Sequence, residues 1–496
     1  MTASLAIASR LSWSAPLLKQ TRRGPRLLSK AVPDATFLEA YQTDPETFRA
    51  AGITCGEYDG RHVACWWKLP GPAAPAKPRN ALNLGGSHYV PRDYQAEAVE
   101  AGVQFMLEPD DDNGIIIIPT GGGKSLVLAL IAQNLPAPTL ILQPSKEVLE
   151  QNCGKFQDYG YHPALYSASV GRKEIGDITL ATIGSIVKKP EHFERFKYCI
   201  VDECHYIGAK NSDSMYMKFF DSTAMKILGC TATPYRLSTD GYGGSILKFL
   251  TRTRPRVFKH VVYFCQNRRL FDAGYLCPLE YRTIDTIDQA RLVLNSTGAD
   301  FTDASVLKEY QRVMFPDILE DTVANLIHEG RKSILVFTRF VAEAQALAQK
   351  FRGAEMVCAE TPKKERERII NGFRAGKIPF VANVGVLGIG FDYPSLDTVV
   401  LAGPTMSLAQ YYQKVGRAIR PHPSKRSAVI VDMVGLVKRF GKIEDLEIHE
   451  GEHEKWWIGS GKRPLTNTYF GVPHGRPDYM PSVNGNRREG NLLPTF

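Results

Sequence analysis

Residues 114–125 read Gly-Ile-Ile-Ile-Ile-Pro-Thr-Gly-Gly-Gly-Lys-Ser, and this stretch decides the fold. Its four consecutive isoleucines predict a buried strand, because parallel strands covered on both faces are apolar throughout. The three glycines allow a tight turn, and the apolar residues after Ser125 predict a helix. A strand, a glycine-rich turn and a helix in this order predict an α/β domain with a phosphate-binding loop.

The residue types of this loop suit a nucleoside triphosphate. Backbone N–H groups of a glycine turn can converge on phosphate oxygens, and the following helix adds the positive end of its dipole. Lys124 can reach the outer phosphates, and the Ser125 hydroxyl can bind Mg²⁺. The pattern departs from its full form at Ile118, where a glycine is usual. We assign ATP and Mg²⁺ as cofactors and expect nucleotide contacts from Thr120, Gly121, Gly122, Gly123, Lys124 and Ser125.

A second motif ends another apolar run, where Asp202-Glu203-Cys204-His205 follows residues 199–201. Asp202 is placed to hold Mg²⁺ together with Ser125, and Glu203 to orient and deprotonate the attacking water. An isolated acidic pair is more often a solvated turn. Its position after a buried strand, downstream of the phosphate loop, favours the catalytic interpretation.

Length and composition favour a multidomain protein with an anionic partner. The chain has 496 residues, which exceeds what one hydrophobic core usually supports, and its net charge of +9 is mildly basic. None of the nine cysteines forms a Cys-x-x-Cys pair, which disfavours a zinc ribbon and favours a reducing compartment. No apolar run approaches the ~18 residues of a membrane span, so we expect no membrane association.

Short apolar runs divide the chain into two series of predicted strands. The first comprises residues 115–118, 139–142, 178–181, 199–201 and 226–228, and the second residues 334–337, 380–382, 398–401 and 428–431. Helix-length segments such as 342–351 lie between them, which predicts an α/β fold of two tandem parallel-sheet domains. We place an N-terminal α+β module at 1–69, a proline-rich linker at 70–86, the domains at 87–278 and 279–437, and a C-terminal extension at 438–496.

Further motifs connect the chain to a known family. Arg92-Asp93-Tyr94-Gln95 precedes the phosphate loop, and Thr231-Ala232-Thr233-Pro234 follows the acidic box. Residues 388–392 read Gly-Ile-Gly-Phe-Asp, and residues 413–420 read Gln-Lys-Val-Gly-Arg-Ala-Ile-Arg. In this order the motifs resemble those of superfamily 2 helicases, over roughly residues 88–433. The chain is most similar in type to DEAH/DECH-box, RadD/UvsW-like helicases of DNA repair and phage recombination, which implies two RecA-like domains, ATP hydrolysis and DNA as partner.

The resemblance also implies roles for individual residues. Gln95 would bond the adenine edge beside Arg92, with Tyr89 as the stacking partner. A coupling group, which comprises His205, Thr231 and Thr233, would link the ATP state to the hold on nucleic acid. Two residues of the second domain, Gly390 and Asp392, would complete the nucleotide site.

The last motif has a spacing with its own chemical meaning. Gln413, Arg417 and Arg420 stand at i, i+4 and i+7, so a helix would place all three on one face. They could then point at a phosphate across a domain cleft, with Arg417 and Arg420 as arginine fingers that are absent until the cleft closes. The simpler alternative is a solvated basic helix face.

In the family, nucleic acid is held by hydroxyls and backbone N–H groups at loop ends, which suits phosphates and reads no sequence. Any one such position would otherwise be an ordinary turn. The matching positions are Pro144, Ser145, Thr182, Gly184 and Ser185 in the first domain and Thr338 and Arg339 in the second, with Thr361 and Arg366 as an extension.

We therefore expect an ATP-dependent DNA helicase or translocase that acts on single-stranded, forked or branched DNA. The alternatives are a duplex-tracking motor of a restriction or remodelling complex, an RNA helicase, and a non-hydrolysing binding protein. We expect a monomer, cytoplasmic and bacterial or phage-encoded, with single-strand-binding or replication and recombination proteins as candidate partners.

The N-terminal module has two interpretations. Residues 1–33 contain six basic residues and no acidic ones, which fits a folded basic strand or arm and, as a minority alternative, a mitochondrial transit peptide. The pair Trp66-Trp67 suggests contact with a duplex or fork, although a core role is the more common meaning of such a pair.

One motif is misleading. Residues 449–453 read His-Glu-Gly-Glu-His and match the zinc-protease pattern, which requires a stable helix to align both imidazoles. Gly451 in its centre disfavours a helix, so we expect a solvated acidic surface segment.

Overall fold

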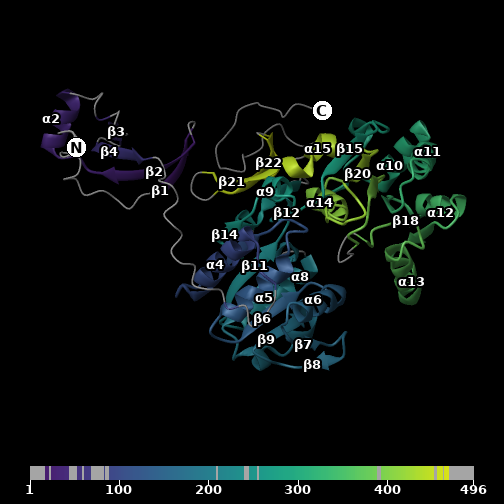
Figure 1. Cartoon of the computed structure of the whole chain (residues 1–496), viewed down its shortest axis with the longest axis horizontal. Helices are drawn as coiled ribbons and strands as arrows, with labels where there is room; N and C mark the ends of the chain where they lie inside the picture. The colour runs from purple at the N-terminus through teal and green to yellow at the C-terminus, as the bar shows by residue number, and fades with distance from the viewer. Residues whose placement is uncertain are drawn as a thin grey trace. The chain divides into compact units, whose positions relative to one another are not determined.

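The computed structural model describes residues 17–21, 24–43, 48, 53–58, 61–68, 83, 89–207, 210–239, 245–253, 256–387, 393–451, 455–461 and 463–467. Figure 1 shows the chain. Its contacts divide it into two compact units, residues 1–82 and residues 83–496. Among the described helices, none is long and apolar enough to cross a membrane.

The first unit is a small antiparallel sheet with one described helix, α2 (Ala35–Thr43). Its strand order is β1-β2-β4-β3, formed by Leu17–Thr21, Gly24–Ala31, Arg61–Lys68 and Ile53–Tyr58. Phe37 of α2 is buried together with Phe48, Ile53 and Ala64. Of the basic residues, Lys19 lies in β1, and Arg26 and Lys30 lie in β2. Trp66 and Trp67 lie in β4, but their side chains fall outside the description.

The first α/β domain of the second unit is built on an eight-stranded sheet of order β14-β5-β11-β10-β6-β9-β7-β8. All of its neighbouring strands are parallel except β7 and β8. The order places β5 (Gly114–Ile117), β11 (Lys226–Thr231) and β10 (Tyr198–Asp202) side by side. Their carboxyl ends therefore meet at one edge, where the glycine loop and the acidic box follow. The remaining strands are β6 (Thr139–Gln143), β7 (Ala164–Ser167), β8 (Arg172–Lys173), β9 (Ile178–Thr182) and β14 (His260–Phe264).

The second domain has a six-stranded parallel sheet of order β15-β20-β19-β16-β18-β17. Its strands are β15 (Leu279–Thr283), β16 (Ile334–Phe337), β17 (Glu355–Val357), β18 (Phe380–Asn383), β19 (Thr398–Leu401) and β20 (Ala428–Asp432). The α/β class with two tandem parallel-sheet domains is confirmed, and each predicted apolar run overlaps a strand. The polar edge strand β15 lacks such a run, because its residues are at most half-buried.

Helices complete both domains. The first domain contains α4 (Asp93–Leu107), α5 (Lys124–Asn134), α6 (Lys146–Asp158), α7 (Ile183–Ile186), α8 (Lys210–Asp221) and α9 (Asn267–Asp272). The second contains α10 (Asp303–Val313), α11 (Phe315–His328), α12 (Val341–Lys350), α13 (Lys363–Arg374), α14 (Leu408–Val415) and α15 (Leu436–Phe440).

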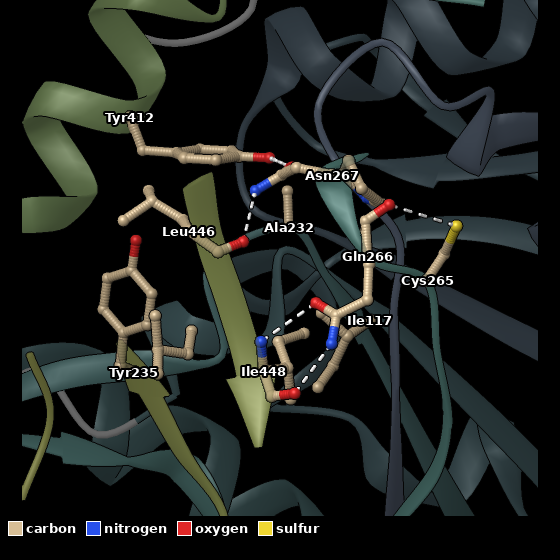
Figure 2. Close-up of a pocket in the computed structure, with 11 residues that line it drawn as sticks. Ile117, Ala232, Tyr235, Cys265, Gln266, Asn267, Tyr412, Leu446 and Ile448 are labelled. Carbon is tan, nitrogen blue, oxygen red and sulfur yellow. Dashed lines mark hydrogen bonds between the residues drawn. The ribbon is translucent and has the colours of Figure 1, made fainter. Parts of the chain in front are cut away.

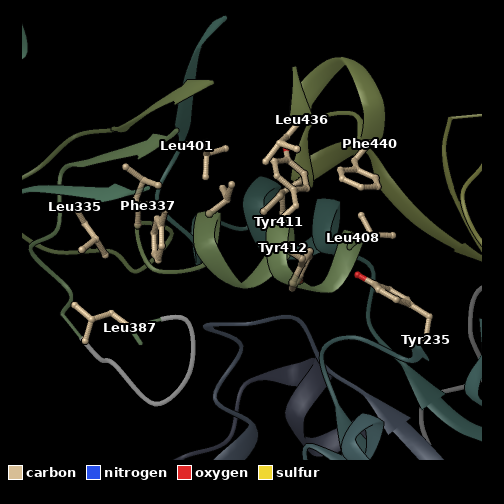
Figure 3. Packing of buried hydrophobic residues seen from close by; sticks show 14 of the residues in the cluster. Tyr235, Leu335, Phe337, Leu387, Leu401, Leu408, Tyr411, Tyr412, Leu436 and Phe440 are labelled. Carbon is tan, nitrogen blue, oxygen red and sulfur yellow. The ribbon is translucent and has the colours of Figure 1, made fainter. Parts of the chain in front are cut away.

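Helix α14 carries the first three residues of the last motif and is fixed in the core of the second domain. Figure 3 shows Tyr411 of this helix beside Leu436 and Phe440, and Tyr235 of the first domain near the same helix. The Tyr411 and Phe440 rings stack with centroids 5.5 Å apart, and the Tyr411 hydroxyl donates to the Gly441 carbonyl at 2.8 Å. A buried helix of this kind holds the residues at its end in a defined position.

The described part of the C-terminal extension forms a three-stranded antiparallel sheet that packs on the first domain. Its strands are β21 (Leu446–His449), β22 (Trp457–Ser460) and β23 (Arg463–Pro464). The Gln266 side-chain amide donates to the Ile448 carbonyl at 2.7 Å and accepts the Ile448 N–H at 2.9 Å (Figure 2). Asn467 likewise accepts the Phe249 N–H at 3.2 Å.

The zinc-protease match lies partly on this sheet. His449 ends strand β21, and its ring stacks on Trp457 with centroids 4.1 Å apart. A strand cannot place both histidines of that pattern on one helical face, and Glu452 and His453 lie outside the described residues. No group of three or more His, Cys, Asp or Glu residues able to hold a metal ion occurs in the described part of the chain.

A buried carboxyl in α12 gives a prediction about stability. Burial raises the pKa of Glu343 from 4.5 to about 7. The folded chain therefore favours the protonated form: the group costs nothing below pH 4.5, and its cost grows as the pH rises to about 7. Glu343→Gln should raise the melting temperature at pH 8.5, by the equivalent of about 3 kcal/mol, and leave it unchanged at pH 4.5.

Thermal unfolding at both pH values would measure this effect. Glu367→Gln, which changes an exposed carboxyl of α13, is the matched control. An equal change at both pH values for Glu343→Gln would contradict the prediction.

Candidate active site

The glycine loop between β5 and α5 adopts a backbone that only glycine accepts readily. Gly121 and Gly123 have φ angles of 80° and 74°, in the left-handed region. A Cβ atom on Gly123 would lie 2.3 Å from the Gln95 side-chain nitrogen, and one on Gly122 would lie 2.7 Å from Ile118. The predicted turn is therefore present and closely packed on both sides.

Helix α4 holds this loop in place through hydrogen bonds. The Tyr94 hydroxyl and the Gln95 amide nitrogen donate to the Gly122 carbonyl at 2.8 and 3.0 Å, and the Gln95 oxygen accepts the Arg92 N–H at 2.9 Å. Both ends of the Gln95 amide are thus engaged within the chain, and the side chain is 5% exposed. This geometry differs from the predicted contact of Gln95 with a base edge.

Lys124 lies between the two carboxylates of the acidic box. Its ammonium is 3.1 Å from an Asp202 oxygen and forms an ion pair with Glu203. Burial alone would lower the pKa of Lys124, but attraction by Asp202 and Glu203 raises it above its usual range. Burial would raise the pKa of Glu203, but Lys124 lowers it below its usual range. Both groups are therefore charged at neutral pH.

Asn152 of α6 was not predicted from the sequence. It accepts the Ser125 hydroxyl at 2.8 Å and donates to the Asp202 carboxylate at 2.8 Å. A further bond, from its amide nitrogen to Gln143 at 2.8 Å, fixes its orientation. Asn152 therefore joins the two predicted metal ligands, but a single asparagine in an amphipathic helix gives no signal that would identify it.

Glu203 has an unusual backbone conformation. Its φ of 49° lies in the left-handed region, which is uncommon for a residue with a side chain. It stands between the end of β10 and the short helical turn Cys204–Tyr206. Such strain is often found at functional sites, and here it accompanies a carboxylate that lines the cleft.

The predicted coupling residues form one hydrogen-bonded cluster. One nitrogen of the His205 ring is 2.8 Å from the Thr231 hydroxyl and 3.1 Å from the Thr233 hydroxyl. The same nitrogen is 3.3 Å from Glu203, and the other lies 3.5 Å from the Gln413 amide of the second domain. A chain of polar contacts thus runs from the acidic box to the last motif.

The last motif is not one helical face as predicted. Helix α14 ends at Val415, and the next N–H groups, of Arg417 and Ala418, bond three residues back in tighter turns. The Gly416 N–H still bonds four residues back, to Tyr412, at 2.8 Å. A Cβ on Gly416 would lie 2.9 Å from the Tyr412 carbonyl and 3.0 Å from Thr120, so the chain passes close to the first domain at this point.

Arg417 and Arg420 nevertheless line the cleft between the two domains, together with the phosphate loop. The sequence had led us to expect both arginines to be away from this loop until the domains close. The cleft also holds Tyr159, Tyr206 and Tyr275, which the sequence did not identify. Of the predicted residues, its lining contains Arg92, Thr120, Gly121, Gly123, Lys124, Ser125, Asp202, Glu203, Thr233, Gln413, Arg417 and Arg420.

Five predicted nucleotide contacts are not in this lining: Gln95 and Gly122, which are hydrogen-bonded to each other, and Tyr89, Gly390 and Asp392. Gly390 and Asp392 lie outside the described residues. Tyr89 is 42% exposed, and its ring packs edge-on against Tyr159 with centroids 5.0 Å apart. Tyr159, rather than Tyr89, lines the cleft.

The predicted nucleic-acid residues of the first domain follow β6 and β9 at the carboxyl edge of the sheet. Ser145 caps α6 by accepting the Val148 N–H at 3.3 Å, after Pro144. The Thr182 and Ser185 hydroxyls are 2.9 Å apart, on either side of the exposed Gly184. These positions share one edge of the sheet, as predicted for loop ends after parallel strands.

The second-domain positions have structural partners instead of a free surface. Arg339 donates to Asp303 at 2.9 Å, to Asp300 at 3.2 Å and to the Phe301 carbonyl at 2.9 Å. Thr338 is 6% exposed, and its hydroxyl donates to the Phe340 carbonyl at 3.3 Å. Both residues therefore brace the loop after β16, and their contact with phosphate stays a prediction.

The proposed extension of the track is engaged in the same way. Arg366 donates to the carbonyls of Cys358, Ala359 and Thr361, and the Thr361 hydroxyl accepts the Cys358 N–H at 3.0 Å. Both residues shape the turn after β17.

The sequence matches two family profiles. Residues 88–236 match the type III restriction enzyme res subunit family, and residues 317–422 match the helicase conserved C-terminal domain family. The two matches coincide with the domains that form the cleft. Together the two matched regions place the chain in helicase superfamily 2.

Characterised relatives are distant in sequence. A 51.5 kDa protein of Lactococcus phage (isolate 7-9) is 27% identical over 64% of this chain and 64% of its own length. The putative ATP-dependent helicase IRC3 of Saccharomyces cerevisiae is 25% identical over 69% of this chain and 51% of its own length. The DNA 3'-5' translocase XPB2 of Sulfurisphaera tokodaii is 24% identical over 69% and 81%, respectively. The chain thus spans about half to two thirds of the first two relatives.

Solved structures share the fold. A fragment of a putative HsdR subunit of a type I restriction enzyme from Vibrio vulnificus YJ016 has a TM-score of 0.52 at 18% identity, covering 87% of this chain and 89% of that one. The type ISP restriction-modification enzyme LlaBIII has a TM-score of 0.52 at 17% identity, covering 70% and 28%. At this identity the likeness establishes the RecA-like architecture.

The His205–Gln413 contact leads to a prediction about the link between the domains. Gln413→Ala should lower the ATPase kcat roughly tenfold, and His205→Ala at least as much, because it also removes the contacts with Glu203, Thr231 and Thr233. The double variant should be no slower than His205→Ala, because both changes break the His205–Gln413 contact. Steady-state ATPase assays of the four proteins measure this. Gln410→Ala, on an exposed position of the same helix, is the control, and additive losses would refute a shared role.

Proposed function

We propose that this chain is an ATP-dependent DNA helicase or translocase that couples hydrolysis in the interdomain cleft to movement on DNA. The observation that carries the proposal is the composition of the cleft. Lys124 and Glu203 come from the first domain, and Arg417 and Arg420 come from the second. A reaction that requires all four links the chemistry to the relative position of the domains.

The oxygen atoms of Ser125 and Asp202, which line the cleft, suit Mg²⁺ as ligands. The Ser125 hydroxyl and the Asp202 carboxylate are oxygen ligands joined through Asn152, and Mg²⁺ commonly uses one or two protein oxygens together with water and phosphate. The ion would neutralise charge on the outer phosphates when bound. Lys124 would bind those phosphates, releasing Glu203 from its ion pair to orient and deprotonate the attacking water.

Arg417 and Arg420 would act as arginine fingers, because both line the cleft that holds Lys124. Their charge would oppose the negative charge that develops on the transferred phosphoryl group. His205 contacts Glu203 in the first domain and Gln413 in the second, at 3.5 Å. A change in the contacts of Glu203 would therefore alter the His205–Gln413 contact between the domains. Hydrolysis would thereby alter the polar link between the domains.

DNA is the proposed track. Relatives named DNA translocase or ATP-dependent helicase support this assignment, as does the net charge of +9. Ser145, Thr182 and Ser185 would hold phosphates of the backbone at the edge of the first domain. We also propose that residues 87–278 and residues 279–437 are the two functional domains of this motor.

A second candidate is a motor that tracks duplex DNA without separating its strands. The name of the XPB2 relative and the restriction-subunit profile over residues 88–236 favour it. Both candidates share the ATPase chemistry and differ in what movement does to the duplex.

Lys124→Ala should reduce DNA-stimulated ATPase activity at least 10³-fold, because the substitution removes the only cation of the buried ion cluster described above. Phosphate release in the presence and absence of DNA would measure this. Lys197→Ala, at an exposed lysine before β10, is the matched control. Wild-type turnover in Lys124→Ala would invalidate the site.

The nucleic-acid assignment predicts that DNA stimulates the ATPase more than RNA does. The assay compares single-stranded DNA, duplex DNA, forks, four-way junctions and RNA, each with the wild type and Lys124→Ala. Stimulation by RNA alone would overturn the DNA assignment. Displacement of a third strand without displacement of a paired strand would favour the duplex-tracking motor.

A further inference from the structure

A buried asparagine joins the first domain to the helix on which the last motif begins. Asn267, the first residue of α9, is 8% exposed, and its side-chain oxygen accepts the Tyr412 hydroxyl of α14 at 2.6 Å (Figure 2). Its side-chain nitrogen donates to the carbonyls of Ile443 and Leu446 at 3.1 and 3.3 Å. Tyr412 belongs to the second domain and both carbonyls to the C-terminal extension, so one side chain of the first domain binds both.

The orientation of the Asn267 amide is determined by these partners. A backbone carbonyl can only accept a hydrogen bond, so the amide nitrogen must face Ile443 and Leu446. Exchange of the nitrogen and the oxygen would place the amide oxygen against two carbonyl oxygens with no proton between them. The amide oxygen therefore faces Tyr412, and the C-terminal extension holds Asn267 in the orientation that accepts the Tyr412 hydroxyl.

The residues before Asn267 strengthen the same attachment. The Gln266 side chain donates to the Ile448 carbonyl and accepts the Ile448 N–H, so it pairs with β21 as a neighbouring strand would. The Phe264 ring packs edge-on against Trp456 with centroids 5.3 Å apart. Asn267 thus lies in a part of the first domain that is held at several adjacent positions.

Tyr412 connects this junction to the segment that carries the arginines, residues 413–420. It lies immediately before Gln413, is 3% exposed, and accepts the Gly416 N–H at 2.8 Å through its carbonyl. Tyr412 and Asn267 also line one small cavity with Pro119, which precedes the phosphate loop. The Asn267–Tyr412 bond therefore attaches the start of the arginine-bearing segment to the domain that carries the phosphate loop.

We infer that Asn267 is a positioning residue, which holds Arg417 and Arg420 in the cleft through its bond with Tyr412. The inference rests on the proposed function, in which both arginines oppose the charge on the transferred phosphoryl group. Asn267 is not among the described residues that line the cleft, so its effect passes through α14. Loss of the bond weakens stabilisation of the transition state and leaves the binding of ATP by the phosphate loop nearly unchanged.

Tyr412→Phe is the smallest change that tests the bond, because it removes the hydroxyl and keeps the ring. It should lower the kcat of DNA-stimulated ATP hydrolysis about three- to tenfold, as expected for one hydrogen bond, and change the KM for ATP less than about twofold. Asn267→Ala should lower kcat at least as much, and the double variant should be no slower than Asn267→Ala. Melting temperatures establish that the variants fold.

Tyr310→Phe is the matched control. The Tyr310 hydroxyl is also buried and donates to the Ala402 carbonyl at 2.6 Å, but both residues lie within the second domain. This variant should keep the wild-type kcat. Wild-type kcat in Tyr412→Phe, or an equal loss of kcat in Tyr412→Phe and Tyr310→Phe, would overturn the inference.

A second measurement separates a role in catalysis from a role in stability. ADP with aluminium fluoride mimics the transferred phosphoryl group, so its affinity reports binding of the transition state. Tyr412→Phe should weaken inhibition by ADP–aluminium fluoride by about the factor by which kcat falls, and leave inhibition by ADP alone unchanged. Equal weakening of both inhibitors would mean a general disturbance of the nucleotide site, and the inference would fail.

Arg417→Ala and Arg420→Ala distinguish failure of the inference from failure of the proposed function. If both variants keep the wild-type kcat, the proposed arginine fingers are wrong, and the inference falls with them. If either variant loses more than about 10²-fold in kcat while Tyr412→Phe and Asn267→Ala lose nothing, only the inference is wrong.

Discussion

The ion cluster of Lys124, Asp202 and Glu203 is the constraint on which the rest of the structure depends. Charges in a buried site are costly unless they are paired, and here one ammonium neutralises part of two carboxylates. The cluster requires that the loop after β5 and the end of β10 meet at one sheet edge, and the strand order provides this. In the proposed reaction, phosphate and metal replace these contacts, so that the resting ion pairs hold the catalytic groups in position.

The second domain contributes to this cluster through positions fixed by packing. Tyr411 and its neighbours anchor α14 in the core of that domain, and Gly416, just after the helix, lies close to Thr120. Arg417, Arg420 and Gln413 thereby line the cleft of the first domain. Tyr412 adds a further contact, since its hydroxyl donates to Asn267 at 2.6 Å, and Asn267 donates to the carbonyl of Leu446, the first residue of β21, at 3.3 Å (Figure 2). Helix α9, helix α14 and the C-terminal extension thus meet near the cleft.

Several elements could be predicted because their signals are local. The isoleucine run before the glycine loop and the strand before Asp202 show their burial in sequence, since both faces of such strands must be apolar. Other elements depend on distant partners. Strand β15 is polar and reads as a loop until it pairs with β20, and Asn152 becomes important only because folding places it between Ser125 and Asp202. The helical face assigned to Arg417 and Arg420 was wrong, because the spacing gave no sign of the neighbouring domain.

By itself, the sequence determined the α/β class and the two series of strands, and it predicted that Lys124, Ser125, Asp202 and Glu203 would share one site, since each follows from residue types at short spacing. Only the tertiary structure decided what each polar side chain does. Gln95 and Arg339 have the residue types expected for a base contact and a phosphate contact, yet both are bonded within their own domains. The physical reason is that hydrogen bonds are satisfied by whatever the fold brings near, and sequence spacing does not specify those neighbours.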